Sequence, residues 1–190
     1  MSVTLRGSVV TLRPFRVEEV DRLFAVWAAA PVGDGVHHHG VPDRTRLKER
    51  VARSGTWSDD EDAGLWLAIE AGGHLVGEIQ ARNPKGGLPP GVFELGIELY
   101  EAPDRGHGLG TAAVAELTGY LFREEEALRV QISTDVDNQA MRRLAERLGF
   151  GGEGVLRGFM PTAHGPRDHA MYGMTRDDWE SVKDGWIRTS

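Results

Sequence analysis

The stretch DRGHGLGTAA, residues 104–113, limits what this chain can fold into more than any other feature. Glycines stand at alternate positions, Gly106, Gly108 and Gly110, directly before a run of small helix-forming residues. Glycine reaches backbone conformations that other residues avoid and carries no side chain, so this spacing lets a backbone approach another molecule closely. The stretch predicts a tight loop that leads into a helix, and the question is which ligand such a loop binds.

Two nucleotide-binding motifs compete for the stretch. A Walker A loop ends in Gly-Lys-Ser/Thr, whereas Thr111 follows Gly110 directly, so that motif is excluded. The dinucleotide fingerprint G-x-G-x-x-A is matched by Gly108, Gly110 and Ala113. In that fingerprint a strand runs straight into the first glycine, but here the segment EAPDRGH intervenes. The chain also lacks the βαβ alternation of a doubly wound sheet, which makes this alternative the weaker one.

A third interpretation uses the whole stretch. Arg105, Gly108 and Gly110 form the pattern R-x-x-G-x-G at the amino end of a helix. Backbone N–H groups there lack helical partners, and together with the helix dipole they attract an anion. The glycines leave room for a pyrophosphate, and Arg105 adds positive charge. A glycine-rich turn without any ligand is the remaining alternative.

Hydrophobic periodicity predicts a single α+β domain over residues 1–190, with a central, mixed and mostly antiparallel sheet flanked by helices. No internal repeat or linker divides the chain. Strands are expected over residues 8–15, 65–71, 74–82, 92–100, 129–136, 155–160 and 169–174. Helices are expected over residues 17–29, 44–55, 109–121 and 138–150, with a last one from Asp177.

Composition narrows the class of protein. The formal net charge of −7 argues against a nucleic-acid partner, because nucleic-acid binding usually needs a basic face. The chain has no cysteine, which excludes disulfides, thiolate zinc sites and a cysteine nucleophile. The amino terminus lacks the apolar core of a signal peptide, and the apolar run from Leu23 is too short to span a bilayer. We therefore expect a cytoplasmic protein without a membrane partner.

The pattern R-x-x-G-x-G between a strand and a helix resembles motif A of the GCN5-related N-acetyltransferases, the GNAT superfamily. The segment NQAMRRLAERLGF resembles motif B of that family, with Asn138 at its head and Gly149-Phe150 at its end. The opening LRPFRVEEVDRLF and the closing DHAMYGMTRDDW resemble the RimJ/RimL branch, which acetylates protein amino termini and contains relatives acting on small amines. The resemblance covers nearly the whole chain.

This resemblance implies a GNAT-like fold that binds acetyl-coenzyme A as co-substrate. The pantetheine arm would lie in a V-shaped opening between the strands of residues 92–100 and 129–136, and the glycine loop would hold the pyrophosphate. Asn138 would contact the pantetheine, although asparagine is also a preferred helix N-cap. The implied cofactor-binding residues are Leu99, Glu101, Arg105, Gly106, His107, Gly108, Leu109, Gly110, Thr111 and Asn138.

The implied reaction is direct attack of a primary amine on the thioester within a ternary complex. The amine must lose a proton, and Glu94 and Glu98 are the candidate catalytic bases because they alternate with the apolar residues of their strand. The alternative is that both carboxylates form the solvated face of a half-buried strand. Many family members carry a tyrosine or a serine as proton donor, but the matching positions here are Ala145 and Met141.

The segment GVHHHG is a second unusual feature. His37, His38 and His39 lie in a loop that, by the resemblance, helps to form the acceptor pocket, so they are candidate substrate-binding residues. A solvated loop is the alternative. We expect no metal site, because only His37 and His39 would point the same way in an extended chain and no partner motif is present. Trp57 and Trp66 are further candidates for lining that pocket.

The acceptor is left open by the sequence. A protein amino terminus or a small cationic amine fits the resemblance and the acidic net charge. A non-catalytic acetyl-coenzyme A sensor is the alternative function, because neither usual proton donor is present. A homodimer is possible through an apolar patch around Trp179 or Trp186.

Overall fold

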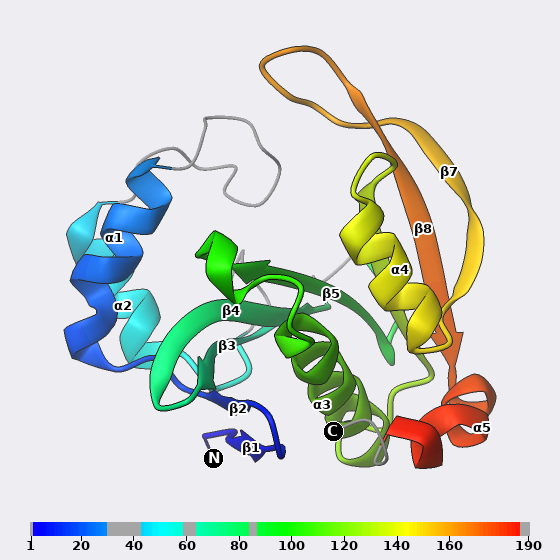
Figure 1. Ribbon diagram of the computed structural model, residues 1–190, viewed down its shortest axis with the longest axis horizontal. Helices are drawn as coiled ribbons and strands as arrows, with labels where there is room; N and C mark the ends of the chain where they lie inside the picture. Colours follow the sequence, from blue (N-terminus) through cyan, green and yellow to red (C-terminus); the bar gives the residue numbers. More distant parts are fainter. Residues whose placement is uncertain (1, 30–42, 59–63, 84–86, 187–190) are drawn as a thin grey trace.

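A computed structural model describes residues 2–29, 43–58, 64–83 and 87–186 of the chain (Figure 1). Within these residues the centre of the molecule is an eight-stranded sheet in the order β1-β2-β3-β4-β5-β6-β8-β7. The strands are β1 (Leu5–Arg6), β2 (Thr11–Arg13), β3 (Gly64–Ala71), β4 (His74–Arg82), β5 (Val92–Leu99), β6 (Arg129–Asp135), β7 (Gly151–Met160) and β8 (Arg167–Thr175).

The sheet is mixed. Each neighbouring pair of strands is antiparallel except β5 and β6, which run parallel at its centre. A parallel pair needs a long crossover, and the chain supplies it with α3 between the two strands. The expected α+β architecture is therefore confirmed, as is the mostly antiparallel sheet.

Helices cover both faces of this sheet (Figure 1). One hydrophobic core joins α3 and residues of α4 and α5 to the sheet, and a smaller core joins α1 and α2 to the opposite face. The α-helices are α1 (Val20–Ala29), α2 (Arg44–Arg53), α3 (Leu109–Arg123), α4 (Gln139–Arg147) and α5 (Arg176–Trp186), and the short 3-10 helices are η1 (Val17–Glu19) and η2 (Ala102–Asp104).

The β3–β4 hairpin shows how local sequence fixes local structure. Apolar residues dominate both strands, and Gly72 and Gly73 join them with φ angles of 56° and 80°. Two consecutive positive φ angles are the requirement of the turn that matches the twist of a β-hairpin, and glycine meets it without strain. The hairpin that this glycine pair predicted is confirmed.

Three expectations are corrected. Of the first strand, expected over residues 8–15, only Thr11–Arg13 forms a strand, β2, and it pairs with β1 at Leu5–Arg6, which was not expected. The strand expected from Val155 begins earlier, at Gly151, because pairing with β8 extends through a glycine-rich stretch. Trp179 is 3% exposed and stacks on Phe122, so it belongs to the core and does not form the expected surface patch, while the homodimer itself stays a prediction.

A buried ion-pair network fastens the amino-terminal segment to the sheet. Arg13 on β2 binds Glu19 of η1 and Glu70 of β3, with N–O distances of 2.6 and 2.8 Å. Burial raises the pKa of Glu19, but hydrogen bonds from Arg13 and Arg16 outweigh it and the net pKa is lowered. The pKa of Glu70 is lowered chiefly by the hydrogen bond from Arg13.

A core substitution should show how much α3 contributes to stability. Leu117 on α3 is 0% exposed, so we expect Leu117→Ala to lower the free energy of unfolding by about 2–5 kcal/mol through lost burial and a residual cavity. Leu128 is 65% exposed and serves as the matched control. Its change to alanine should alter stability by less than about 0.5 kcal/mol in urea denaturation. Equal losses in both variants would contradict the assignment of α3 to the core.

The Arg13 network predicts a pH dependence. Because the pKa values of Glu19 and Glu70 are lowered in the folded protein, their contribution to stability is present above the unfolded pKa. It is lost as the pH falls through the lowered folded values. Arg13→Gln should cost about 1–3 kcal/mol near pH 7, and the difference from wild type should shrink at acidic pH. The exposed Arg143→Gln is the control, and a pH-independent difference would contradict the assignment.

Candidate active site

The site is built where the parallel strands part. β5 and β6 pair in register only from Val92 to Glu94 with Arg129 to Gln131. Beyond these pairs β5 continues to Leu99 and β6 to Asp135 without pairing with each other. The diverging edges agree with the expected V-shaped opening, and peptide groups of β5 beyond Glu94 are left without a partner on β6.

The opening where β5 and β6 separate is called the fork below. The glycine loop, residues 104–110, leads into α3 beside it. Gly106 and Gly108 have φ angles of 82° and 84°, in the left-handed region that favours glycine. A Cβ atom at either position would meet no other atom within 4 Å, so the space next to both backbones is open. Gly108 is the N-cap of α3, and the first helical hydrogen bond runs from the Ala112 N–H to the Gly108 carbonyl.

The amino end of α3 therefore presents N–H groups that have no partner inside the helix. These belong to Leu109, Gly110 and Thr111. Gly110 serves packing, since a Cβ there would lie 3.4 Å from Leu144 of α4 and 3.8 Å from Ile97 of β5. The close approach holds the helix terminus, with its positive dipole end, against the fork.

Arg105 is bound to the end of β5. Its Nε and Nη2 atoms donate to the Leu99 carbonyl over 3.2 and 2.9 Å. Leu99 and Arg105, both predicted to bind the cofactor, thus contact each other. The Leu99 carbonyl is engaged by Arg105. The nearby His107 and Glu101 are exposed, and Glu101 is the N-cap of η2. The bond holds the guanidinium beside the glycine loop.

Asn138 is a helix cap. Its Oδ1 accepts the Met141 N–H over 3.1 Å, which confirms the N-cap interpretation. The cap leaves the Nδ2 donor of the same amide unused, so the ligand role stays a prediction. Ala145, where many relatives have tyrosine, is 0% exposed and packs in the core, and Met141 is partly buried against it.

Glu94 lies at the point where β5 and β6 separate, on the face opposite Leu95. Arg82 of β4 donates to its Oε1 over 2.8 Å, and Gln131 of β6 donates to its Oε2 over 3.0 Å. Ser133 lies 3.5 Å from the same carboxylate. Three side chains from two strands therefore fix the position of this carboxylate.

Glu98 lies further along the same face of β5, directly opposite Glu78 of β4. Glu78 is 6% exposed and accepts a hydrogen bond from the Tyr100 hydroxyl over 2.7 Å. Burial and the Glu78 carboxylate raise the pKa of Tyr100 well above its ordinary value, so the phenol stays protonated. The two predicted catalytic carboxylates thus share one face of the sheet.

His169 is a buried histidine on the Glu94 face that the sequence analysis did not single out. It lies on β8 opposite Asp135, is 8% exposed, and its Nδ1 has no hydrogen-bond partner in the part of the chain that the structure describes. Burial lowers the pKa of His169 against the opposing effects of Asp135 and Glu94, so the imidazole is neutral near pH 7. Alternation along β8 could have placed it on the Glu94 face, but only the His37–His39 run drew notice.

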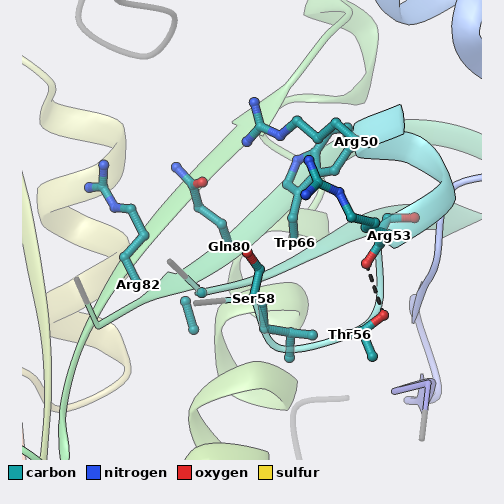
Figure 2. A pocket seen from close by; sticks show the side chains of 11 residues that line it. Arg50, Arg53, Thr56, Ser58, Trp66, Gln80 and Arg82 are labelled. Atoms are coloured by element: carbon teal, nitrogen blue, oxygen red, sulfur yellow. Dashed lines mark hydrogen bonds between the residues drawn. The ribbon is translucent and has the colours of Figure 1, made fainter. Parts of the chain in front are cut away.

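A pocket opens on this same face, between α2 and strands β3 and β4 (Figure 2). Its walls include Arg50 and Arg53 of α2, Trp66 of β3, and Gln80 and Arg82 of β4. Arg82 connects it to Glu94. Trp66 lines this pocket, whereas Trp57 packs against Phe93 on the other face, and a role in acceptor binding stays a prediction for both.

Three further expectations concern the histidine triplet, a metal site and a membrane span. His37, His38 and His39 lie outside the described residues, so their substrate role stays a prediction. Among residues 2–29, 43–58, 64–83 and 87–186, no cluster of three His, Cys, Asp or Glu side chains is arranged to hold a metal ion. None of the helices in this part of the chain is both long enough and apolar enough to cross a membrane.

Comparison with known proteins shows the family of the chain. Residues 10–151 match the acetyltransferase (GNAT) domain family. The chain belongs to this family. The acetyltransferase is 29% identical over 121 residues to YokL, an uncharacterized N-acetyltransferase of the SPbeta prophage of Bacillus subtilis strain 168, covering 64% of this chain and 67% of YokL. It is 31% identical over 141 residues to a mycothiol acetyltransferase of Salinispora arenicola strain CNS-205, covering 74% of this chain and 44% of that protein.

Solved structures show the same fold. The ribosomal L7/L12 α-N-protein acetyltransferase RimL, solved with coenzyme A, superposes with a TM-score of 0.75 at 18% identity, covering 93% of this chain and 99% of RimL. A GCN5-related N-acetyltransferase from Brucella melitensis superposes with a TM-score of 0.73 at 23% identity, covering 99% and 85% of the two chains. The expected GNAT-like fold is confirmed for this acetyltransferase.

A matched glycine pair tests the loop. Gly108→Ala and Gly73→Ala both place a side chain in open space at a positive φ angle, so both should lower stability by about 1–2 kcal/mol. Only Gly108 lies at the amino end of α3, so only its variant should weaken coenzyme A binding in calorimetry, by about tenfold if one charge-assisted hydrogen bond is lost. Unchanged affinity in the Gly108 variant would remove the loop from the binding site.

Proposed function

We propose that this acetyltransferase transfers the acetyl group of acetyl-coenzyme A to a primary amine by direct attack in a ternary complex. The observation that carries the proposal is the fork between β5 and β6, which has anion-binding N–H groups on one face and fixed carboxylates on the other. Such a division suits two substrates that approach one reacting centre from opposite sides. Proximity is then the main source of catalysis.

Binding of the co-substrate would use the α3 face. The N–H groups of Leu109, Gly110 and Thr111 would receive the pyrophosphate, and Gly106 and Gly108 leave the open space that it requires. Peptide groups of β5 beyond Glu94, which β6 leaves unpaired, would bond the extended pantetheine arm as a neighbouring strand would. Asn138 would add its Nδ2 donor.

Chemistry would take place at the Glu94 face. The amine nitrogen attacks the thioester carbonyl, the C–S bond breaks, and coenzyme A leaves as a thiolate while the nitrogen loses a proton. Glu94 and Glu98 are the candidate acceptors of that proton, directly or through water. A backbone N–H of β5 would stabilise the oxyanion. Ala145 and Met141 supply no hydroxyl, so the thiolate would leave unassisted.

The acceptor would be a protein amino terminus or a small amine. The carboxylates of Glu78, Glu94 and Glu98 lie on the acceptor face and suit an ammonium group before it loses its proton. RimL, a structural neighbour, is an α-N-protein acetyltransferase of ribosomal L7/L12.

A non-catalytic acetyl-coenzyme A sensor is the second candidate. The buried Ala145 at the usual tyrosine position favours it, since a sensor needs no proton donor. Release of free thiol from acetyl-coenzyme A in the presence of a panel of amines separates the two functions. Amine-dependent release supports the enzyme, whereas tight binding without release supports the sensor.

The carboxylates provide the mechanistic test. We expect Glu94→Gln to lower kcat by about 100-fold, the usual contribution of a general base, and Glu98→Gln to lower it less because Glu98 lies further from the fork. Glu124→Gln, at an exposed position after α3, should match wild type. Wild-type rates in both site variants would remove a carboxylate base from the mechanism.

A further inference from the structure

The arginine-lined pocket beside the fork has no role in the reaction described so far. Arg50 projects into it from α2, with its guanidinium 4.4 Å from the ring centre of Trp66 and 5.3 Å from that of Trp27. Within the described residues no carboxylate pairs with Arg50. The faces of two indole rings thus fix the position of the Arg50 guanidinium, while its N–H groups donate to no carboxylate among the described residues.

Further donors lie beside this guanidinium. Trp66 is 7% exposed, and its indole N–H is buried without a hydrogen-bond partner in the structure as described. Gln80 and Arg82 lie on β4 and line the pocket. Figure 2 shows Arg50, Gln80 and Arg82 extending toward the same side of the sheet. Because the Trp66 N–H is buried, the donors open to a ligand are those of Arg50 and Gln80, which suit a ligand that supplies acceptor oxygens.

The pocket adjoins the reacting centre. Gln80 is the register neighbour of Gly96 on β5, and its Nε2 lies 3.0 Å from where a Cβ of Gly96 would be. Its side chain therefore lies across β5 next to the fork. Arg82 lines the pocket and also binds Glu94 over 2.8 Å. Arg82 thus connects the pocket that holds Arg50 with the Glu94 carboxylate.

We infer that this pocket binds an anionic group of the acceptor, so that the substrate is an amine carrying a carboxylate at its other end. The inference rests on the proposed N-acetyltransferase function and specifies its substrate class. A carboxylate matches the planar guanidinium of Arg50, which can donate two parallel N–H bonds to it. The chain carries a net charge of −7, so an anionic acceptor needs such a local site to offset general repulsion.

Turnover with matched acceptors tests this. The acceptors are ω-amino carboxylates from β-alanine to aminocaproate, their carboxamides, the corresponding aminoalkyl phosphonates and the diamine cadaverine, with thiol release as the readout. Wild type should prefer carboxylates over carboxamides in kcat/KM by about tenfold or more, as a hydrogen-bonded charge implies. A stronger preference for phosphonates would identify a phosphate-type anion as the natural group.

Variants of α2 assign the preference to Arg50. Arg50→Gln should reduce the carboxylate-to-carboxamide ratio to near one, Arg50→Lys should keep part of it, and the exposed Arg46→Gln on the same helix should leave it unchanged. Acetyl-coenzyme A affinity should be the same in all of them. Because the amine pKa belongs to the free acceptor, it cancels when the ratios of wild type and variant are compared.

A binding measurement keeps the inference testable if no amine is acetylated. Glutarate should bind wild type in calorimetry and bind Arg50→Gln at least about tenfold more weakly, with both proteins giving the same circular dichroism spectrum. Coenzyme A binding without turnover would refute the proposed enzyme, and glutarate binding alone would still support the pocket. Amine turnover without charge preference, or with preference for cadaverine, would overturn the inference and leave the enzyme standing.

Discussion

The short parallel contact between β5 and β6 organises the rest of the molecule. Parallel strands need a crossover, and α3 supplies it by packing Leu117, Leu121 and Phe122 into the main core. Because the pairing ends at Glu94, the strands that carry the site part at the point where α3 begins on one face and the carboxylates lie on the other. A longer ladder would close the fork and pair the β5 peptide groups that a ligand needs.

The two faces of the sheet differ in chemistry for a physical reason. On the α3 face, backbone N–H groups and a helix dipole attract anions without titratable side chains. On the α1 and α2 face, charged side chains of neighbouring strands contact each other, as Arg82 and Glu94 do, and buried polar groups such as His169 lie beside them. The proposed reaction would need both environments, since acetyl-coenzyme A carries phosphates and the proposed amine must give up a proton.

Much of this arrangement could be predicted from local sequence. The glycine stretch predicted a loop and a helix start at Gly108, the Gly72-Gly73 pair predicted a hairpin, and alternation along β5 placed Glu94 opposite Leu95. These features depend on residues close together in the chain. Roles that depend on contacts between side chains and other segments were harder to predict from the sequence. Examples are the bond from Arg105 to Leu99 and the position of Trp179 in the core.

By itself, the sequence determined the elements, the face that each strand residue occupies, and the family motifs around Arg105 and Asn138. The elements and strand faces follow from backbone preference and hydrophobic period, which act over a few residues, whereas the motifs follow from the resemblance to the GNAT family. Only the tertiary structure decided that the β5–β6 pairing stops at Glu94, that Arg82 binds this carboxylate, and that Arg50 and Trp66 share a pocket with Gln80. Register and helix placement result from packing between distant segments, and no local pattern contains that information.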